Sequence, residues 1–343
     1  MMCRFSTHAV LCGVAVLMLS AGGFPHAEAN DSMAELDNSG LVLITSGDVE
    51  MRSEDLYISM DEVRVRYVFY NRSDEDITTL VAFPMPDIVG EPYGVGPALP
   101  SDNPVNLMNF TVSADGRSVA PQVEQRVRAA GIDRTAFLDQ HGIPLAPHLL
   151  STEDRLTALS PEIQADLVRY GMVHKNEFDE GQGRVVQLTP VWTLSTTFYW
   201  EQTFPAGQEV VVEHRYQPSV GATAGVVFLD YQTAEPDPVL FPEYVQKYCI
   251  GPSFTRAVQK HHQAGGGFPF TESYVAYVLR TGANWAGAIG RFRLVVDKGS
   301  TDNLVSFCGE GVTKIAPTQF EMVKEDFWPE RDLNVLFVVR HPR

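Results

Sequence analysis

Hydrophobic and polar residues alternate along much of the chain, which is the pattern of half-buried β-strands. Residues 61–71 show it clearly, because alternate positions from Val63 to Phe69 are apolar while Arg64 and Arg66 lie between them. Such a strand places one face in a hydrophobic core and the other in solvent. Similar short runs recur towards both ends of the chain, so the pattern predicts a mainly β protein.

The connections between these runs predict antiparallel pairing. Residues 107–127 are typical of a β-hairpin with Asp115-Gly116 in its turn, and residues 196–216 predict a second hairpin. Residues 333–340 are apolar on both faces, which favours a central strand covered on both sides. We therefore predict an all-β fold, mainly an antiparallel β-sandwich in two lobes, with a small helical insertion.

Helical spacing interrupts the alternation between residues 131 and 183. Ser160 and Pro161 form a helix start, with a capping side chain followed by proline at the first helical position. Its apolar residues are too few for a core of its own, so we interpret this segment as an insertion. The predicted organisation is listed by residue number: a signal peptide at 1–29, a first β lobe at 30–130 and 184–230, the helical insertion at 131–183, and a second β lobe at 231–343.

The first 29 residues are typical of a cleaved secretory signal peptide. An apolar run from Ala9 to Leu19 follows the basic Arg4, and Ala27-Glu28-Ala29 matches an A-x-A cleavage site. The run is too short for a spanning helix, which needs roughly 20 residues, and an uncleaved anchor is the alternative. Lipid attachment at Cys12 is another alternative, although the small residues that normally precede such a cysteine are missing. We expect cleavage after Ala29 and no transmembrane segment in the mature protein.

The net charge of −17 bears on possible partners. Removing the signal peptide leaves this value unchanged, because one base and one acid are lost together. An acidic surface disfavours nucleic acid and anionic lipid, since both are polyanions. The sequence therefore predicts an exported, acidic protein with no nucleic-acid partner.

Only two cysteines follow the signal peptide. Cys249 and Cys308 are an even pair in an exported chain, which favours a disulfide. The alternative is one reactive thiol and one uninvolved cysteine.

Histidines and known sequence motifs give no strong indication of catalysis. The chain lacks the common hydrolase, zinc-protease, redox and nucleotide-binding motifs, so we predict no catalytic residues, metal or cofactor. His214 lies on an apolar strand face, which is typical of a core residue. His261 and His262 are adjacent on a short predicted helix, whereas two ligands of one metal on a helix need a spacing of four residues.

Two loops rich in glycine and proline are the predicted places for binding. The first covers residues 87–106, and the second contains Gly265-Gly266-Gly267. Plain surface connections are the alternative. The candidate binding residues are Tyr93, Phe268, Phe270, His261 and His262.

Several segments together resemble a known family. They are "NDSMAELDNSGLVL", "MRSEDLYIS", "YNRSDEDITTLVAFPMPDI", "FPAGQEVVVEHRYQPSVG" and "VSFCGEGV". In this order they resemble the exported bacterial proteins of domain-of-unknown-function family 4424, over roughly residues 30–340. The resemblance implies a place in the bacterial envelope, most simply the periplasm, and it supports the disulfide between Cys249 and Cys308. It implies no activity and no catalytic residue.

Two classes of function follow from these observations. The first is a non-enzymatic periplasmic binding protein, whose partner is an envelope protein or a glycan ligand. The second is a periplasmic metal-dependent or glycan-acting hydrolase that uses His261, His262 and nearby acids. A purely structural envelope protein is a third reading.

Overall fold

A computed structural model describes most of the chain that follows the predicted signal peptide. The described residues are 30–37, 40–92, 98–179, 181, 183–263 and 266–341. The signal peptide and the candidate Tyr93 lie outside them.

The largest sheet has eight strands and combines early and late parts of the chain. Its strands are β3 (Val49–Ile58), β4 (Val63–Asn71), β7 (Thr111–Ala114), β8 (Arg117–Val119), β14 (Glu209–Tyr216), β17 (Ile289–Asp297), β19 (Thr313–Lys314) and β20 (Gln319–Phe327). Their order across the sheet is β19-β20-β17-β3-β4-β14-β7-β8. β3 and β17 run parallel, whereas the other strand pairs of this sheet are antiparallel.

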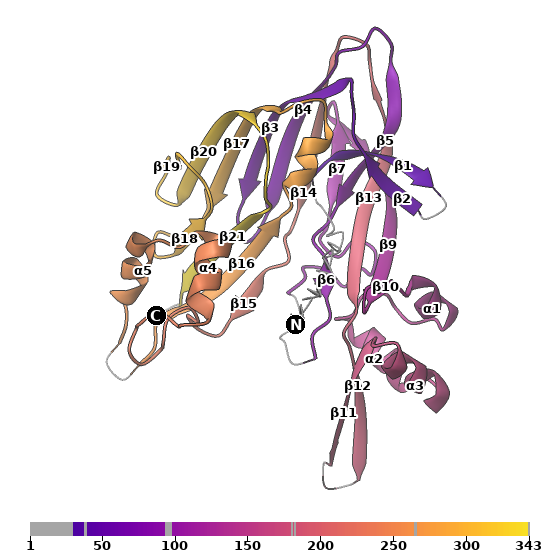
Figure 1. Ribbon diagram of the computed structural model, residues 1–343, viewed down its shortest axis with the longest axis vertical. Coiled ribbons are helices and arrows are strands. Elements are labelled where there is room, and N and C mark those ends of the chain that lie inside the picture. The colour runs from indigo at the N-terminus through magenta and orange to yellow at the C-terminus, as the bar shows by residue number, and fades with distance from the viewer. Residues whose placement is uncertain are drawn as a thin grey trace, which may run out of the picture.

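Two further sheets and a two-stranded hairpin complete the described architecture. Figure 1 shows the seven-stranded sheet on the right and the eight-stranded sheet on the left. The seven-stranded sheet contains β1 (Ser32–Asp37), β2 (Gly40–Ile44), β5 (Ile77–Pro84), β6 (Ile88–Val89), β9 (Gln122–Ala129), β10 (Ile132–Asp133) and β13 (Thr193–Phe204). The four-stranded sheet contains β15 (Gly221–Thr223), β16 (Phe270–Tyr277), β18 (Leu304–Phe307) and β21 (Leu333–Arg340). A separate hairpin is formed by β11 (Val173–Asp179) and β12 (Arg184–Pro190).

One large hydrophobic core joins these three sheets. Alternate residues of β4, from Val63 to Phe69, are buried in it as the sequence pattern predicts. Side chains such as Phe83 of the seven-stranded sheet and Phe337 of the four-stranded sheet belong to the same core. The predicted mainly antiparallel β fold is confirmed. Strands from both predicted lobes share the eight-stranded sheet, and the division into two lobes stays a prediction.

The turns and the last strand agree with the sequence pattern. Asp115 and Gly116 both have positive φ values, 48° and 74°, and they connect β7 to β8 as a tight hairpin. β21 lies between β16 and β18, with Val335 to Val338 buried in succession. This strand is therefore covered on both faces.

Three helices occupy much of the predicted insertion, namely α1 (Thr135–Gln140), α2 (Leu150–Thr157) and α3 (Pro161–Arg169). The predicted start of α3 is confirmed, because the Ser160 side chain accepts a hydrogen bond from the amide of Ile163. The segment also contains β11, which the sequence pattern did not indicate. Leu138, Leu156 and Leu167 are buried in the large core, so the helices pack on the β scaffold.

A second, smaller core lies on the other face of the four-stranded sheet. It is covered by α4 (Leu240–Tyr248) and α5 (Pro252–Gln259), and a short 3-10 helix, η1 (Arg280–Asn284), follows β16. Among the described residues, no helix has the length and apolar character needed to cross a membrane.

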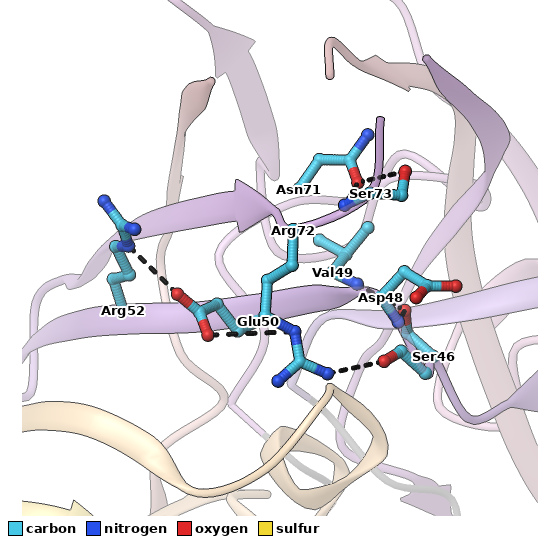
Figure 2. Close-up of polar contacts among 9 residues, drawn as sticks. Ser46, Asp48, Val49, Glu50, Arg52, Asn71, Arg72 and Ser73 are labelled. Atoms are coloured by element: carbon cyan, nitrogen blue, oxygen red, sulfur yellow. Dashed lines mark hydrogen bonds and ion pairs between the residues drawn. The ribbon is translucent and has the colours of Figure 1, made fainter. Parts of the chain in front are cut away.

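The end of β4 is fixed by a buried asparagine, shown in Figure 2. The Asn71 side chain donates to the carbonyls of Glu75 and Phe204 at 2.8 and 2.9 Å. Its oxygen accepts from the amide and the hydroxyl of Ser73 at 2.9 and 2.8 Å. Arg72 donates to the carbonyl of Gly47 at 2.7 Å, which ties this turn to the start of β3. The amide of Asn71 is thus fully used within the fold.

A Gly290→Ala substitution is expected to destabilise the protein by about 1–3 kcal/mol, the usual cost of overpacking. The register between β3 and β4 shifts at Arg52, and a Cβ on Gly290 of β17 would lie 2.7 Å from the Arg52 carbonyl oxygen. Urea unfolding measures the change. Gly225→Ala is the matched control, because a Cβ there meets no atom within 4 Å. Equal midpoints for the two variants would contradict this explanation.

Candidate functional site

The two adjacent histidines point to different neighbours. The His261 ring packs edge-on against Phe270, with 5.1 Å between ring centres. His262 lies against Phe268, and its Nε2 is 2.9 Å from the carbonyl oxygen of Tyr231. No group of three or more histidine, cysteine or acidic side chains placed to hold a metal occurs in the described part of the chain.

The two phenylalanines predicted as binding residues differ in their exposure to solvent. Phe270 is fully buried in the second core, whereas Phe268 is half-buried at its margin. The structure therefore brings His261, His262, Phe268 and Phe270 together as two ring contacts beside the second core. Their role in binding stays a prediction, and that of Tyr93 falls outside the described residues.

His214 is a core residue with an acidic partner. Its Nε2 lies 2.9 Å from Oδ1 of Asp31, and both side chains are completely shielded from solvent. Burial raises the pKa of Asp31, although the neighbouring His214 opposes this effect. The sequence pattern indicated the burial of His214 and gave no indication of its carboxylate partner.

A cavity of about 480 Å³ beside the disulfide is the best candidate site. The Cys249–Cys308 disulfide joins the end of α4 to the segment after β18, and both cysteines line the cavity. Figure 1 shows α4 beside β18 and β21. The remaining wall comes from β17, β20 and the connection between β20 and β21.

The inner part of this cavity is apolar. It is formed by Leu279, Leu294, Met322 and Leu333, all of which are buried, together with the half-buried Phe327. Because these side chains come from several strands that are fixed by the large core, the cavity is preformed. Ligand sites are typically of this kind, with an apolar lining and a few polar groups that orient the ligand.

Charged residues surround the opening. Lys324 pairs with Glu310 at 3.1 Å, and Arg280 pairs with Asp332 at 3.2 Å, which holds the β20–β21 connection. Arg331 is exposed at the cavity and has no ion-pair partner within 4.0 Å among the described residues. Its guanidinium group can therefore bind an anion without breaking an existing pair.

Trp328 adds an exposed aromatic ring to the same opening. It is 56% exposed, whereas the other three tryptophans of the chain, at positions 192, 200 and 285, are at most 3% exposed. An exposed indole beside an apolar cavity favours stacking on a flat ligand. Trp328 is not among the binding residues predicted from the sequence. The available indication was its position in the polar turn "DFWPERD", where an aromatic residue has no core to fill.

A larger hollow of about 760 Å³ lies over the eight-stranded sheet and is lined mainly by polar and charged residues. Arg293 in this hollow pairs with Asp55 and Glu321 at 2.9 and 2.7 Å, and Arg215 pairs with Glu62 at 3.1 Å. These arginines already have carboxylate partners, and no tryptophan lines the hollow. The disulfide cavity is therefore the better candidate for a ligand.

Comparison with known proteins identifies a family but no activity. The family model described as "Domain of unknown function (DUF4424)" matches residues 29–336. The chain gave no match among curated proteins.

Solved structures show only distant similarity. A Legionella pneumophila protein for which nutrient binding has been suggested is 16% identical, with a TM-score of 0.44, over 91% of this chain and 70% of that one. A zinc metallopeptidase of the M1 class from Deinococcus radiodurans is 9% identical, with a TM-score of 0.26, over 85% of this chain and 43% of that one.

Proposed function

The chain belongs to the DUF4424 family, and we propose that it is an exported binding protein that holds a small ligand in the disulfide cavity. The observation that carries this proposal is the combination, at one opening, of an apolar cavity, an exposed Trp328 and Arg331, which has no ion-pair partner among the described residues. The volume of about 480 Å³ suits a small molecule.

The chemistry of the lining suggests the class of ligand. A flat, weakly polar group stacks on Trp328 and enters the apolar interior, while an anionic group pairs with Arg331. A glycan that carries a carboxylate or a short acidic peptide has both features. The overall negative charge of the protein disfavours larger polyanions.

A periplasmic location fits these features. The first 29 residues have the order of a signal peptide, and the disulfide requires an oxidising compartment. The proposal of export rests on this pattern and on the disulfide together.

Binding of the dye 8-anilinonaphthalene-1-sulfonate is expected to report the cavity, because the dye carries an aromatic system and one anionic group. Trp328→Ala should weaken its binding by at least about tenfold and Arg331→Gln by a smaller factor, consistent with the loss of 1–2 kcal/mol of stacking or ion pairing. Fluorescence titration measures both constants. Thermal unfolding should change little, since both side chains are exposed.

Tyr231→Ala is the matched control for this titration. Tyr231 is 58% exposed and does not line the cavity, so its removal should leave dye binding unchanged. Unaltered dye affinity in both cavity variants would exclude the cavity as the binding site. Native mass spectrometry of protein purified from the periplasm then identifies the natural ligand. The ligand is the additional mass that is bound to the unsubstituted protein and absent from the Trp328→Ala variant.

A further inference from the structure

The residue that follows the predicted cleavage site lies in the interior of the protein. Asn30 and Asp31 are completely buried, although Asn30 becomes the first residue when the signal peptide is removed after Ala29. Chain termini normally lie at the surface, because a charged α-amino group loses its hydration when it is buried. A buried first residue therefore needs partners that compensate for this loss.

The contacts of Asn30 fix it between sheets. Its Nδ2 donates to Oε2 of Glu54 at 3.3 Å and to the carbonyl oxygen of Leu279 at 3.4 Å. Tyr67 donates its hydroxyl hydrogen to Oδ1 of Asn30. These partners belong to β3, to β4 and to the segment between β16 and η1, so the position of Asn30 is set by the mature fold.

The surroundings of Asn30 contain a surplus of acidic groups. Glu54 is fully buried. It accepts two long hydrogen bonds from neutral donors, one from Nδ2 of Asn30 at 3.3 Å and one from the Tyr277 hydroxyl at 3.4 Å. No lysine or arginine pairs with Glu54 within the described ranges. Asp31 pairs through Oδ1 with His214, and its Oδ2 is buried without a hydrogen-bond partner.

We propose that cleavage after Ala29 creates an α-ammonium group that stays in this interior and pairs with Glu54 and with the free Oδ2 of Asp31. Removal of the signal peptide then completes the core. The proposal shares with the proposed function only the premise of export, and it is independent of the cavity.

The chemistry of cleavage supplies what the cluster lacks. Hydrolysis of the Ala29–Asn30 peptide bond by the signal peptidase adds water, which leaves a carboxylate on Ala29 and an amine on Asn30. The amide nitrogen of the precursor offers one hydrogen and no charge, whereas the ammonium offers three hydrogens and a positive charge. The family match begins at residue 29, next to this bond.

The pH dependence of stability should differ between the two forms. Without a cation nearby, burial raises the pKa of Glu54 to about 8. In the unfolded chain Glu54 loses its proton near pH 4.5, whereas in the folded uncleaved form it keeps the proton up to about pH 8. Because the folded state binds more protons between these values, the uncleaved form loses stability as the pH rises from about 4.5 to 8. The groups that face Glu54 are Asn30, Asp31 and Tyr277, with Tyr67 and His214 beyond them, and among these His214 alone can carry a positive charge.

The experiment compares two forms of the folded protein. One begins at Asn30 after natural export, with the first residue verified by mass spectrometry, and the other carries an additional Gly-Ser in front of Asn30. At pH 8 the mature form should unfold at a temperature at least about 5 °C higher, a shift expected for a buried ion pair in a chain of this size. The difference should shrink at pH 5, where Glu54 of the extended form is protonated.

Glu54→Gln tests the pairing itself. The substitution should raise the unfolding temperature of the extended form and lower that of the mature form, because it removes an unpaired charge from one and the ion-pair partner from the other. Glu272→Gln is the matched control, since Glu272 is equally buried but accepts hydrogen bonds from Tyr244, Tyr274 and the amide of Val227. It should affect both forms alike.

Chemical labelling gives a second, independent readout. An amine-reactive reagent at neutral pH should modify the α-amino group of the mature protein at least about tenfold more slowly in the native than in the unfolded state. A first residue other than Asn30, rapid native labelling, or an equal effect of Glu54→Gln on both forms would each overturn the proposal.

Discussion

Replacing Trp285 with alanine is expected to lower the free energy of unfolding by about 3–5 kcal/mol, the range for removal of a large buried aromatic side chain. Trp285 is 1% exposed, and its ring centre lies 4.4 Å from that of Phe69. Its Nε1 also donates to the carbonyl oxygen of Asp31 at 2.7 Å. The substitution therefore leaves a cavity and removes the hydrogen bond to the Asp31 carbonyl, close to the predicted cleavage site. Urea unfolding at 25 °C measures the change.

Two comparisons separate these causes. Trp285→Phe retains most of the packing but loses the hydrogen bond, and we expect it to cost about 1–3 kcal/mol. Trp328→Ala removes the same side chain from an exposed position and should change stability by less than about 0.5 kcal/mol. If Trp285→Ala and Trp328→Ala had similar effects, burial at position 285 would not be the stabilising factor.

Reduction of the Cys249–Cys308 disulfide is expected to destabilise the protein by about 4 kcal/mol. The two cysteines are 59 residues apart, and the loop-closure entropy of a loop of that length gives this value. Both sulfur atoms lie next to the cavity, so reduction should also weaken dye binding. Unfolding curves with and without dithiothreitol, together with mass analysis of alkylated protein, measure the two effects.

The double variant Cys249→Ser, Cys308→Ser is the control for side reactions of the reductant. Its unfolding midpoint should equal that of the reduced protein and should not respond to dithiothreitol. Two alkylated thiols in freshly isolated protein, or a midpoint that reduction leaves unchanged, would contradict a stabilising disulfide.

Many of the strands could be predicted from the sequence because they carry a periodicity of their own, whereas β11 could not. Val63 to Phe69 alternate, Asp115-Gly116 permits a turn with positive φ, and Ser160 caps a helix. These signals are local, so no alignment with other regions is needed to recognise them.

The arrangement of the sheets and the site depend on contacts between distant segments. The parallel pairing of β3 with β17 joins residues about 240 positions apart, and no local pattern indicates it. The cavity likewise combines Cys249, Leu279 and Trp328 from separate elements. Asn30 and Glu54 are polar residues that a composition-based reading places at the surface, and their burial became evident only in three dimensions.

If the chain is exported from its N-terminus, as proposed above, the β3–β17 pairing also constrains when it can fold. In that case β3 cannot gain its full parallel neighbour until residues up to Val296 have crossed the membrane. Closing so long a loop is slow and has a high entropic cost. The edge of β3 that later pairs with β17 therefore stays open in the meantime, which makes this strand a target for aggregation or for chaperones. Overproduction of this protein should accordingly place its greatest demand on chaperones late in translocation, before the last fifty residues have crossed.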